Sequence, residues 1–203
     1  EPAPREGGGA SAAGGASGLQ RKFRPPAPPV APGEQNAIVR ASRKPLVVLA
    51  SMIDKTPNLA GLCRTSEVFH CEALCLANAK IAKDPTFQSI SVTAEKWLPI
   101  QQVPRAALRE KLVELRRRGY ALVGVEQTHT SVPLDEWRFA PQTALLLGAE
   151  KEGIDAELLP LLDACVEIPQ DGQIRSLNVH VSGSLVIWEY TRQMRQRKSD
   201  SRS

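Results

Sequence analysis

Residues 46–78, "LVVLASMIDKTPNLAGLCRTSEVFHCEALCLAN", decide the class of fold. The short apolar runs at 46–51 and 72–78 predict two strands, and the segment between them, 57–70, has the apolar spacing typical of a helix. A strand, a helix and a second strand in succession indicate an α/β domain with a parallel, buried sheet. The candidate core residues of this helix are Leu59, Leu62, Val68 and Phe69.

The same alternation continues through the rest of the chain. The segment at 104–119, "PRAALREKLVELRRRG", predicts an amphipathic helix, because a proline opens it, a glycine closes it and three leucines share one face. We therefore expect an α/β domain with a mainly parallel sheet, flanking helices and a ligand at the carboxyl ends of the strands. The other predicted elements are strands at 120–126, 143–150 and 164–169 and helices at 155–163 and 176–195.

The 203 residues have a net charge of +4, which is unevenly distributed. Residues 1–36 have four basic and three acidic residues, and residues 192–203 have five basic and one acidic, so the remainder carries a net charge of −1. Charge alone is therefore a weak indication of a nucleic-acid partner. Because residues 1–36 are mostly Gly, Pro, Ala and Ser, we expect a disordered segment there. A domain at 45–195 and a basic tail at 196–203 would follow.

The cysteines and the apolar runs bear on the compartment. Cys63, Cys71, Cys75 and Cys165 lie in apolar stretches, which predicts buried, reduced thiols in a cytoplasmic or nuclear protein. No metal site is expected, because Cys71 and Cys75 with His70 lack a second ligand cluster. No run approaches the roughly 18 apolar residues of a membrane span, and no signal peptide is evident. Because the chain does not begin with methionine, we expect a fragment or a processed product.

Polar residues that packing does not require follow two of the predicted strands. In the first loop, "TPNLAGLCRT" (56–65), Asn58 and Arg64 bracket small residues. In the second, "LLLGAEKEGI" (145–154), Gly148 allows close backbone approach and Glu150 follows a buried strand. Each loop also has an ordinary interpretation, since asparagines cap helices and glycines and carboxylates form turns.

A third loop, "IPQDGQIRSLNVHV" (168–181), leads from a strand into the final helix. It places Arg175, Ser176 and Asn178 beside a flexible Gly172. Helix N-termini have unpaired N–H groups and a positive dipole end, so such a turn is suited to holding a ligand.

The three loops together resemble the motifs of a known family. The order N-L-A-G-x-x-R-T, L-G-A-E-x-x-G and I-P-x-x-G-x-x-x-S-L-N-V is similar to that of the SpoU (TrmH-like) family, which are S-adenosylmethionine-dependent RNA ribose 2′-O-methyltransferases of the SPOUT superfamily. The resemblance covers about 45–195 and looks closest to the C-terminal domain of the eukaryotic tRNA guanosine-18 2′-O-methyltransferases of the TAR RNA-binding-protein type. The chain departs from the common bacterial pattern at Gln170, where methionine is usual, and at His180, where a small polar residue is usual.

The resemblance implies a fold, a donor site and an assembly. The fold would contain a C-terminal deep trefoil knot, a feature that composition and periodicity do not predict. The knot's loops would bind S-adenosylmethionine, with Gly172 permitting a tight backbone, and family members act as homodimers through the knot helices. The residues expected at the donor are Gly148, Ile168 and Leu177, with Glu126 nearby.

The resemblance also implies a reaction, methyl transfer to a ribose 2′-hydroxyl of tRNA, most simply at guanosine 18. In the family, the arginine at the position of Arg64 acts on the 2′-hydroxyl as activating group or base, with Asn58 fixing it and the ribose-phosphate. Glu150, Ser176 and Asn178 would orient Arg64 and the nucleotide. Because a guanidinium is effectively always protonated, we expect Arg64 to clamp the phosphate and developing alkoxide. A phosphate oxygen or water would then take the proton.

Two other readings compete with this one. A Rossmann-type enzyme would have a glycine-rich loop after its first strand, where this chain has "MIDKTPN". A catalytically inactive RNA-binding relative of the same fold stays open as the alternative. Such a relative would not need to keep all five of the polar residues that the resemblance places at the reacting groups.

Overall fold

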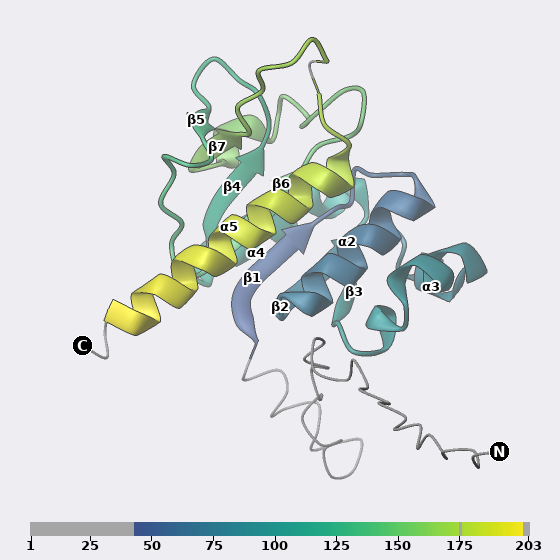
Figure 1. Ribbon diagram of the computed structural model, residues 1–203. Coiled ribbons are helices and arrows are strands. Elements are labelled where there is room, and N and C mark those ends of the chain that lie inside the picture. Colours follow the sequence, from purple (N-terminus) through teal and green to yellow (C-terminus); the bar gives the residue numbers. More distant parts are fainter. Residues whose placement is uncertain (1–42, 175, 201–203) are drawn as a thin grey trace, which may run out of the picture. The chain divides into compact units, whose positions relative to one another are not determined.

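The computed structural model describes residues 43–174 and 176–200, which form an α/β domain built on a parallel sheet (Figure 1). The sheet has seven strands in the order β3-β2-β1-β6-β4-β7-β5, and every neighbouring pair is parallel. The predicted fold class is confirmed. The strands are β1 (Lys44–Leu49), β2 (Cys71–Leu76), β3 (Ile100–Gln102), β4 (Ala121–Val125), β5 (Val132–Pro133), β6 (Thr143–Leu147) and β7 (Ala164–Glu167).

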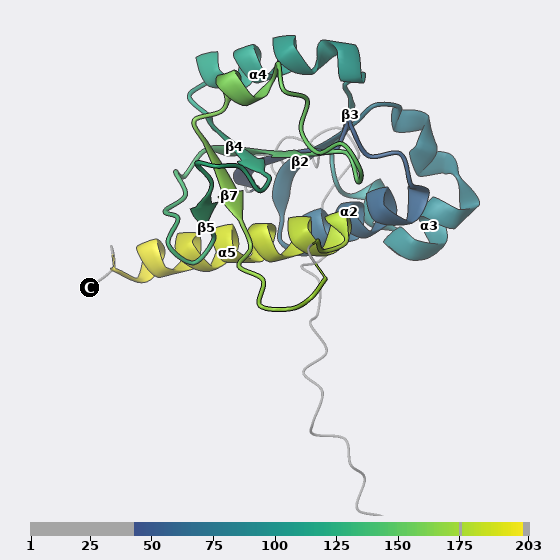
Figure 2. The same ribbon diagram turned by 90° about the horizontal axis from the view of Figure 1, so that it is seen from above.

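Helices cover both faces of this sheet. Figures 1 and 2 show α2 and α5 side by side on one face and α4 on the other, with α3 beside α2. The helices are α2 (Thr56–Val68), α3 (Pro85–Ser91), α4 (Leu108–Arg117) and α5 (Val179–Asp200). Short 3-10 turns lie at Ala79–Lys83 (η1), Ala94–Lys96 (η2), Arg105–Ala107 (η3) and Leu159–Leu161 (η4).

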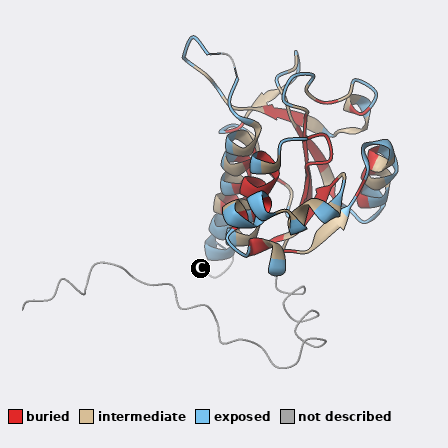
Figure 3. Ribbon diagram, turned by 90° about the vertical axis from the view of Figure 1, so that its right-hand side faces the viewer, coloured by how far each residue is buried: buried red, intermediate tan, exposed pale blue. Residues whose placement is uncertain are grey.

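Successive side chains of the central strands enter two different cores. Leu46 and Val48 of β1 belong to the core under α2 and α5, whereas Val47 and Leu49 belong to the core under α4. Side chains along a strand alternate between its faces, so a sheet buried on both sides needs a nearly continuous apolar run. The central strands are accordingly coloured mostly as buried in Figure 3.

Helix α4 confirms the predicted amphipathic pattern. Leu108, Leu112 and Leu115 are fully buried, and Gly119, just past the helix, has a φ of +88° that glycine adopts without strain. The segment before Leu108 is a 3-10 turn, η3, rather than the start of the α-helix.

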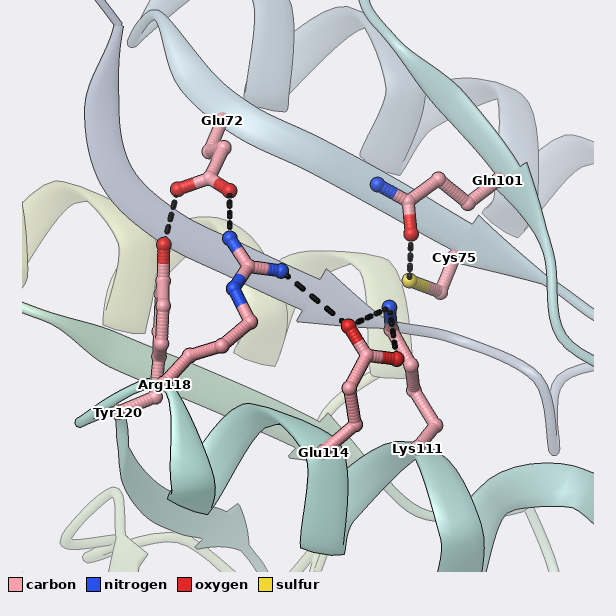
Figure 4. Close-up of polar contacts among 7 residues, drawn as sticks. All are labelled: Glu72, Cys75, Gln101, Lys111, Glu114, Arg118 and Tyr120. Carbon is pink, nitrogen blue, oxygen red and sulfur yellow. Dashed lines mark hydrogen bonds and ion pairs between the residues drawn. The ribbon is translucent and has the colours of Figure 1, made fainter.

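A polar network connects α4 to the amino ends of the strands (Figure 4). Glu72 of β2 accepts hydrogen bonds from the Tyr120 hydroxyl and, at 2.9 Å, from Arg118 Nη2. Arg118 also contacts Glu114, which Lys111 pairs at 2.9 Å. Burial and the neighbouring Glu72 carboxylate raise the pKa of Tyr120. The polar groups at this edge of the sheet therefore bond to one another.

The structure corrects three details of the predicted elements. Val68 is 68% exposed rather than in the core, because the face of α2 that contains Leu59, Leu62 and Ser66 turns inward and Val68 does not share it. Phe69 is partly buried against that core. The segment 155–163 contains only the short turn η4, in which Pro160 lacks the N–H that an α-helix would use.

The final helix begins at Val179, three residues later than predicted, because Asn178 caps it. The Asn178 Oδ1 accepts hydrogen bonds from the backbone N–H groups of His180 (2.9 Å) and Val181 (3.3 Å). The helix continues to Asp200 and so includes residues that the sequence placed in a basic tail. Residues 1–36 lie outside the described part of the chain.

The remaining global features concern the cysteines and membrane spans. All four cysteines are buried and unpaired, and burial raises the pKa of Cys63, Cys71 and Cys75 to about 12. These thiols therefore remain protonated at neutral pH. Among the described helices, none is both long enough and apolar enough to cross a membrane.

Candidate functional site

Side chains from the three polar loops meet at the carboxyl edge of the sheet. Asn58, in the first turn of α2, donates a hydrogen bond from Nδ2 to the carboxylate of Glu150, which follows β6. The Nδ2 of Asn178, at the start of α5, donates to Asn58 Oδ1 at 3.0 Å. These contacts join residues that are 92 and 120 positions apart. The three motifs therefore form one network and are not three separate turns.

The network is held on both sides by neighbouring groups. Asn58 is only 8% exposed, so its amide is largely withdrawn from water. The ammonium of Lys55 lies 3.5 Å from the second oxygen of Glu150. Asn178 uses its oxygen to cap α5 and its nitrogen to bind Asn58, which fixes the helix start relative to α2. Both amides are thus oriented by bonds to both of their ends.

A cavity of about 500 Å³ opens beside this network. Its volume lies within the range typical of small-molecule and cofactor sites. All four residues predicted at the donor line it, namely Glu126, Gly148, Ile168 and Leu177. Three of the five residues predicted at the reacting groups also line it, namely Glu150, Ser176 and Asn178.

The loop after β6 forms one wall of the cavity in a tight conformation. Ala149 and Gly153 bond to each other through both backbone pairs, at 2.8 and 3.0 Å. A Cβ at Gly148 would lie 2.5 Å from the Gly153 carbonyl carbon and 2.7 Å from Ile154 N, so only glycine fits. The Glu126 carboxylate accepts the Ile154 N–H at 3.0 Å and so ties this loop to the end of β4.

Gly172 does not have the role that the sequence predicted for it. Its φ is outside the left-handed region, and the nearest atom to a Cβ built there would be Ile174 N, at 4.0 Å. The backbone at this position would therefore accept other residues. Arg175, in the same loop, lies outside the described residues.

Arg64 is separated from the network in this chain. It lies six residues after Asn58 on α2, or about 9 Å along the helix axis at about 1.5 Å per residue. Its side chain is exposed and does not line the cavity. Among residues 43–174 and 176–200 it has no hydrogen-bond or ion-pair partner. The structure thus brings Asn58, Glu150 and Asn178 together without Arg64.

Sequence reasoning missed several residues of the cavity. Val125 and Leu147 are the last residues of neighbouring strands β4 and β6, so their place at the carboxyl edge could have indicated them. The other unpredicted lining residues are Lys55, Gln127, Ala149, Lys151, Gly153, Val166, Glu167, Gln170, Val179 and Ser182.

Comparison with known proteins places this domain in a family. Residues 45–188 match the model of the SpoU rRNA Methylase family. The chain belongs to this family. It is 53% identical over 148 residues to "tRNA (guanosine(18)-2'-O)-methyltransferase TARBP1" of Mus musculus and 38% identical over 151 residues to the tRNA (guanosine(18)-2'-O)-methyltransferase of Saccharomyces cerevisiae. These alignments cover 73% and 74% of this SpoU-family chain but only 9% and 10% of the two relatives.

Solved structures agree with the family assignment. The TrmH/SpoU tRNA modifying enzyme of A. aeolicus superposes with a TM-score of 0.69 at 26% identity, covering 81% of this SpoU-family chain and 85% of that one. The SpoU methyltransferase AviRb of Streptomyces viridochromogenes, in complex with the cofactor AdoMet, superposes with a TM-score of 0.64 at 25% identity, covering 74% and 60%. The fold and the family therefore agree.

Proposed function

We propose that this domain transfers a methyl group from S-adenosylmethionine to a ribose 2′-hydroxyl in tRNA, at guanosine 18. The observation that carries the proposal is the joining of Asn58, Glu150 and Asn178 by hydrogen bonds at the edge of a cavity of about 500 Å³. The two relatives named above support the choice of nucleotide, since both are tRNA (guanosine(18)-2'-O)-methyltransferases. We also propose that the protein acts inside the cell, in the cytoplasm or the nucleus.

The residues of the cavity fit a nucleoside-like donor. Part of the cavity wall is apolar and is formed by Leu147, Val166, Ile168 and Leu177. At Gly148, which has no side chain, a ligand can approach the backbone closely. Charged and polar side chains line the rest of the cavity, Glu126 and Glu150 among them, and groups of this kind fix the orientation of a bound cofactor. When bound, the donor supplies a methyl group on a sulfonium, which is an excellent leaving group. The protein's own tasks are then to align the hydroxyl and to handle its proton.

The network gives each side chain a part in these tasks. Asn58 and Asn178 hold the start of α2 against the start of α5, so the nucleotide would meet rigid amides. Arg64, on the same helix as Asn58, would clamp the phosphate and the developing alkoxide of the ribose. The proton leaves to a phosphate oxygen or to water, because the guanidinium cannot accept it.

We also propose that the chain acts as a homodimer through the knot helices. Val181, Leu185 and Trp188 are 43%, 40% and 44% exposed, and their spacing places them on one side of α5. Adjoining exposed apolar side chains are typical of protein interfaces. The threading of the chain into a trefoil knot is likewise inferred from the family, with α5 as the helix that follows the knotted loop.

One observation favours the second candidate, a catalytically inactive RNA-binding relative. Arg64 is exposed and does not line the cavity, so the chain by itself does not assemble all the residues of the proposed reaction.

Methyl transfer to defined RNA distinguishes the two candidates. The purified chain would be incubated with S-adenosylmethionine and an unmodified tRNA transcript, and the nucleosides would be measured by mass spectrometry. We expect 2′-O-methylguanosine from this transcript and none from a matched transcript with 2′-deoxyguanosine at position 18. Calorimetry should detect binding of S-adenosylmethionine and none of NAD. Donor binding without methyl transfer would favour the inactive relative, and absence of donor binding would refute the cavity assignment.

A further inference from the structure

The ring of His180, near the start of α5, lies directly against Gly61 in the middle of α2. A Cβ built on Gly61 would be 2.5 Å from His180 Nδ1 and 2.7 Å from Nε2, distances at which atoms overlap. The ring is half-buried, and it is further fixed by Thr65, whose Oγ1 lies 3.3 Å from Nε2. Thr65 Oγ1 in turn lies 3.0 Å from Ser184 Oγ. The two helices are therefore joined by a ring that fits onto a glycine and by two hydroxyl contacts.

This joint lies between the residues of the proposed reaction. Gly61 is three residues after Asn58 and three before Arg64 on α2. His180 is two residues after Asn178, which binds Asn58 at 3.0 Å. A change in the spacing of the two helices at Gly61 would move Asn58 away from Asn178 and would change the direction of Arg64. A change at this joint would thus alter the geometry of the network from outside the cavity.

We infer that His180 is a positioning residue for methyl transfer, with Gly61 as its size-matched partner on α2. The inference rests on the proposed function. Neither residue lines the cavity, so the effect acts through the spacing of α2 and α5 and not through contact with the donor. Burial lowers the pKa of His180, so the neutral ring predominates at neutral pH and can hydrogen-bond to Thr65. Because Gly61 has no side chain, it leaves the space that the His180 ring occupies.

Helix propensity and overlap with the His180 ring predict opposite changes in melting temperature for Gly61→Ala. Alanine is a better helix former than glycine, so Gly61→Ala should stabilise α2 if the space beside it were open. Overlap with the His180 ring predicts a lower melting temperature instead. Removing the ring by His180→Ser should reverse the sign, so that Gly61→Ala raises the melting temperature in that background.

Gly183 provides a matched control on the same pair of helices. A Cβ there would lie 2.6 Å from Leu62 Cδ2 and 3.2 Å from Leu147 Cδ1, not against the His180 ring. Gly183→Ala should therefore lower the melting temperature equally with His180 or with serine at position 180. This comparison separates a specific Gly61–His180 pair from a general loosening of the interface.

The experiment measures melting temperature, donor affinity and the kcat and KM of tRNA methylation for Gly61→Ala, His180→Ser and the double variant. We expect Gly61→Ala to lower kcat about 10- to 100-fold, the scale of a displacement of about 1 Å, with donor affinity nearly unchanged. The double variant should recover kcat to at least the level of His180→Ser alone.

Equal destabilisation by Gly61→Ala in both backgrounds would overturn the pairing. A changed melting temperature with normal kcat would overturn the positioning role. A wild-type protein without methyltransferase activity would instead refute the proposed function, an outcome distinct from either of these.

Discussion

Replacement of Asn58 by alanine tests the network most directly. The change removes the amide that donates to Glu150 and accepts from Asn178. A neutral hydrogen bond contributes about 0.5–1.5 kcal/mol net and one to a charged group about 1.5–3 kcal/mol. Glu150 keeps Lys55 at 3.5 Å and adjoins the cavity, where water can reach it. We therefore take the lower ends of both ranges and expect the free energy of unfolding to fall by about 2 kcal/mol. For a domain of this size the melting temperature would fall by about 4–8 °C.

The same variant should separate chemistry from donor binding. Asn58 does not line the cavity, so Asn58→Ala should retain donor affinity while methyl transfer to tRNA falls about 10-fold or more. Asn178→Ala removes the bond to Asn58 and the cap of α5. The double variant should therefore lose about 1 kcal/mol less stability than the sum of the single variants, measured by urea denaturation. The exposed helix cap at Asn78, which accepts from Lys80 N at 3.0 Å, serves as control, because its loss should add to that of Asn58. Strict additivity of Asn58→Ala and Asn178→Ala would refute the reasoning.

Three further outcomes are expected from single substitutions. Arg64→Ala should keep the fold and donor affinity but reduce turnover on tRNA by at least about 100-fold, and Arg64→Lys should rescue little; near-normal methylation would make Arg64 an ordinary surface residue. Gly148→Val and Leu177→Asp should each abolish donor binding in calorimetry while leaving the domain folded, and unchanged affinity in both would refute the proposed donor site. Val92→Gly should raise the free energy of unfolding by about 1 kcal/mol, measured by urea denaturation. The exposed Val92 has a left-handed φ of 49°, which is unfavourable for a β-branched residue. A lower free energy of unfolding would refute this.

The elements that could be predicted from the sequence are those whose apolar residues repeat at a regular spacing. The three leucines of α4 repeat at helical spacing, and the central strands are buried on both faces, so their patterns are unambiguous. The elements that were missed lack such a period. The segment β5 consists of Val132 and Pro133 only, and β3 has the mixed sequence at 100–102, so only pairing with longer neighbours makes them strands.

The site was predictable in its place but not in its geometry. Parallel strands present their carboxyl ends at one edge, so a site there followed from the fold class. The meeting of Asn58, Glu150 and Asn178 depends on contacts across 92 and 120 residues, and only the resemblance to a family indicated it. The fit of His180 on Gly61 depends on two helices whose relative position no local pattern encodes.

The order of the strands explains why the cavity and the amide network share one loop. Strand β6 pairs with β1 on one side and with β4 on the other, so the loop that follows it lies between the segment leading to α2 and the end of β4. At its start, Glu150 accepts from Asn58; at its end, Ile154 N donates to Glu126. The backbone pairs between Ala149 and Gly153 make this loop a stiff link between the two contacts. A change at Gly148 or Gly153 should therefore disturb donor binding and the amide network together, whereas a change at Asn58 should disturb the network alone.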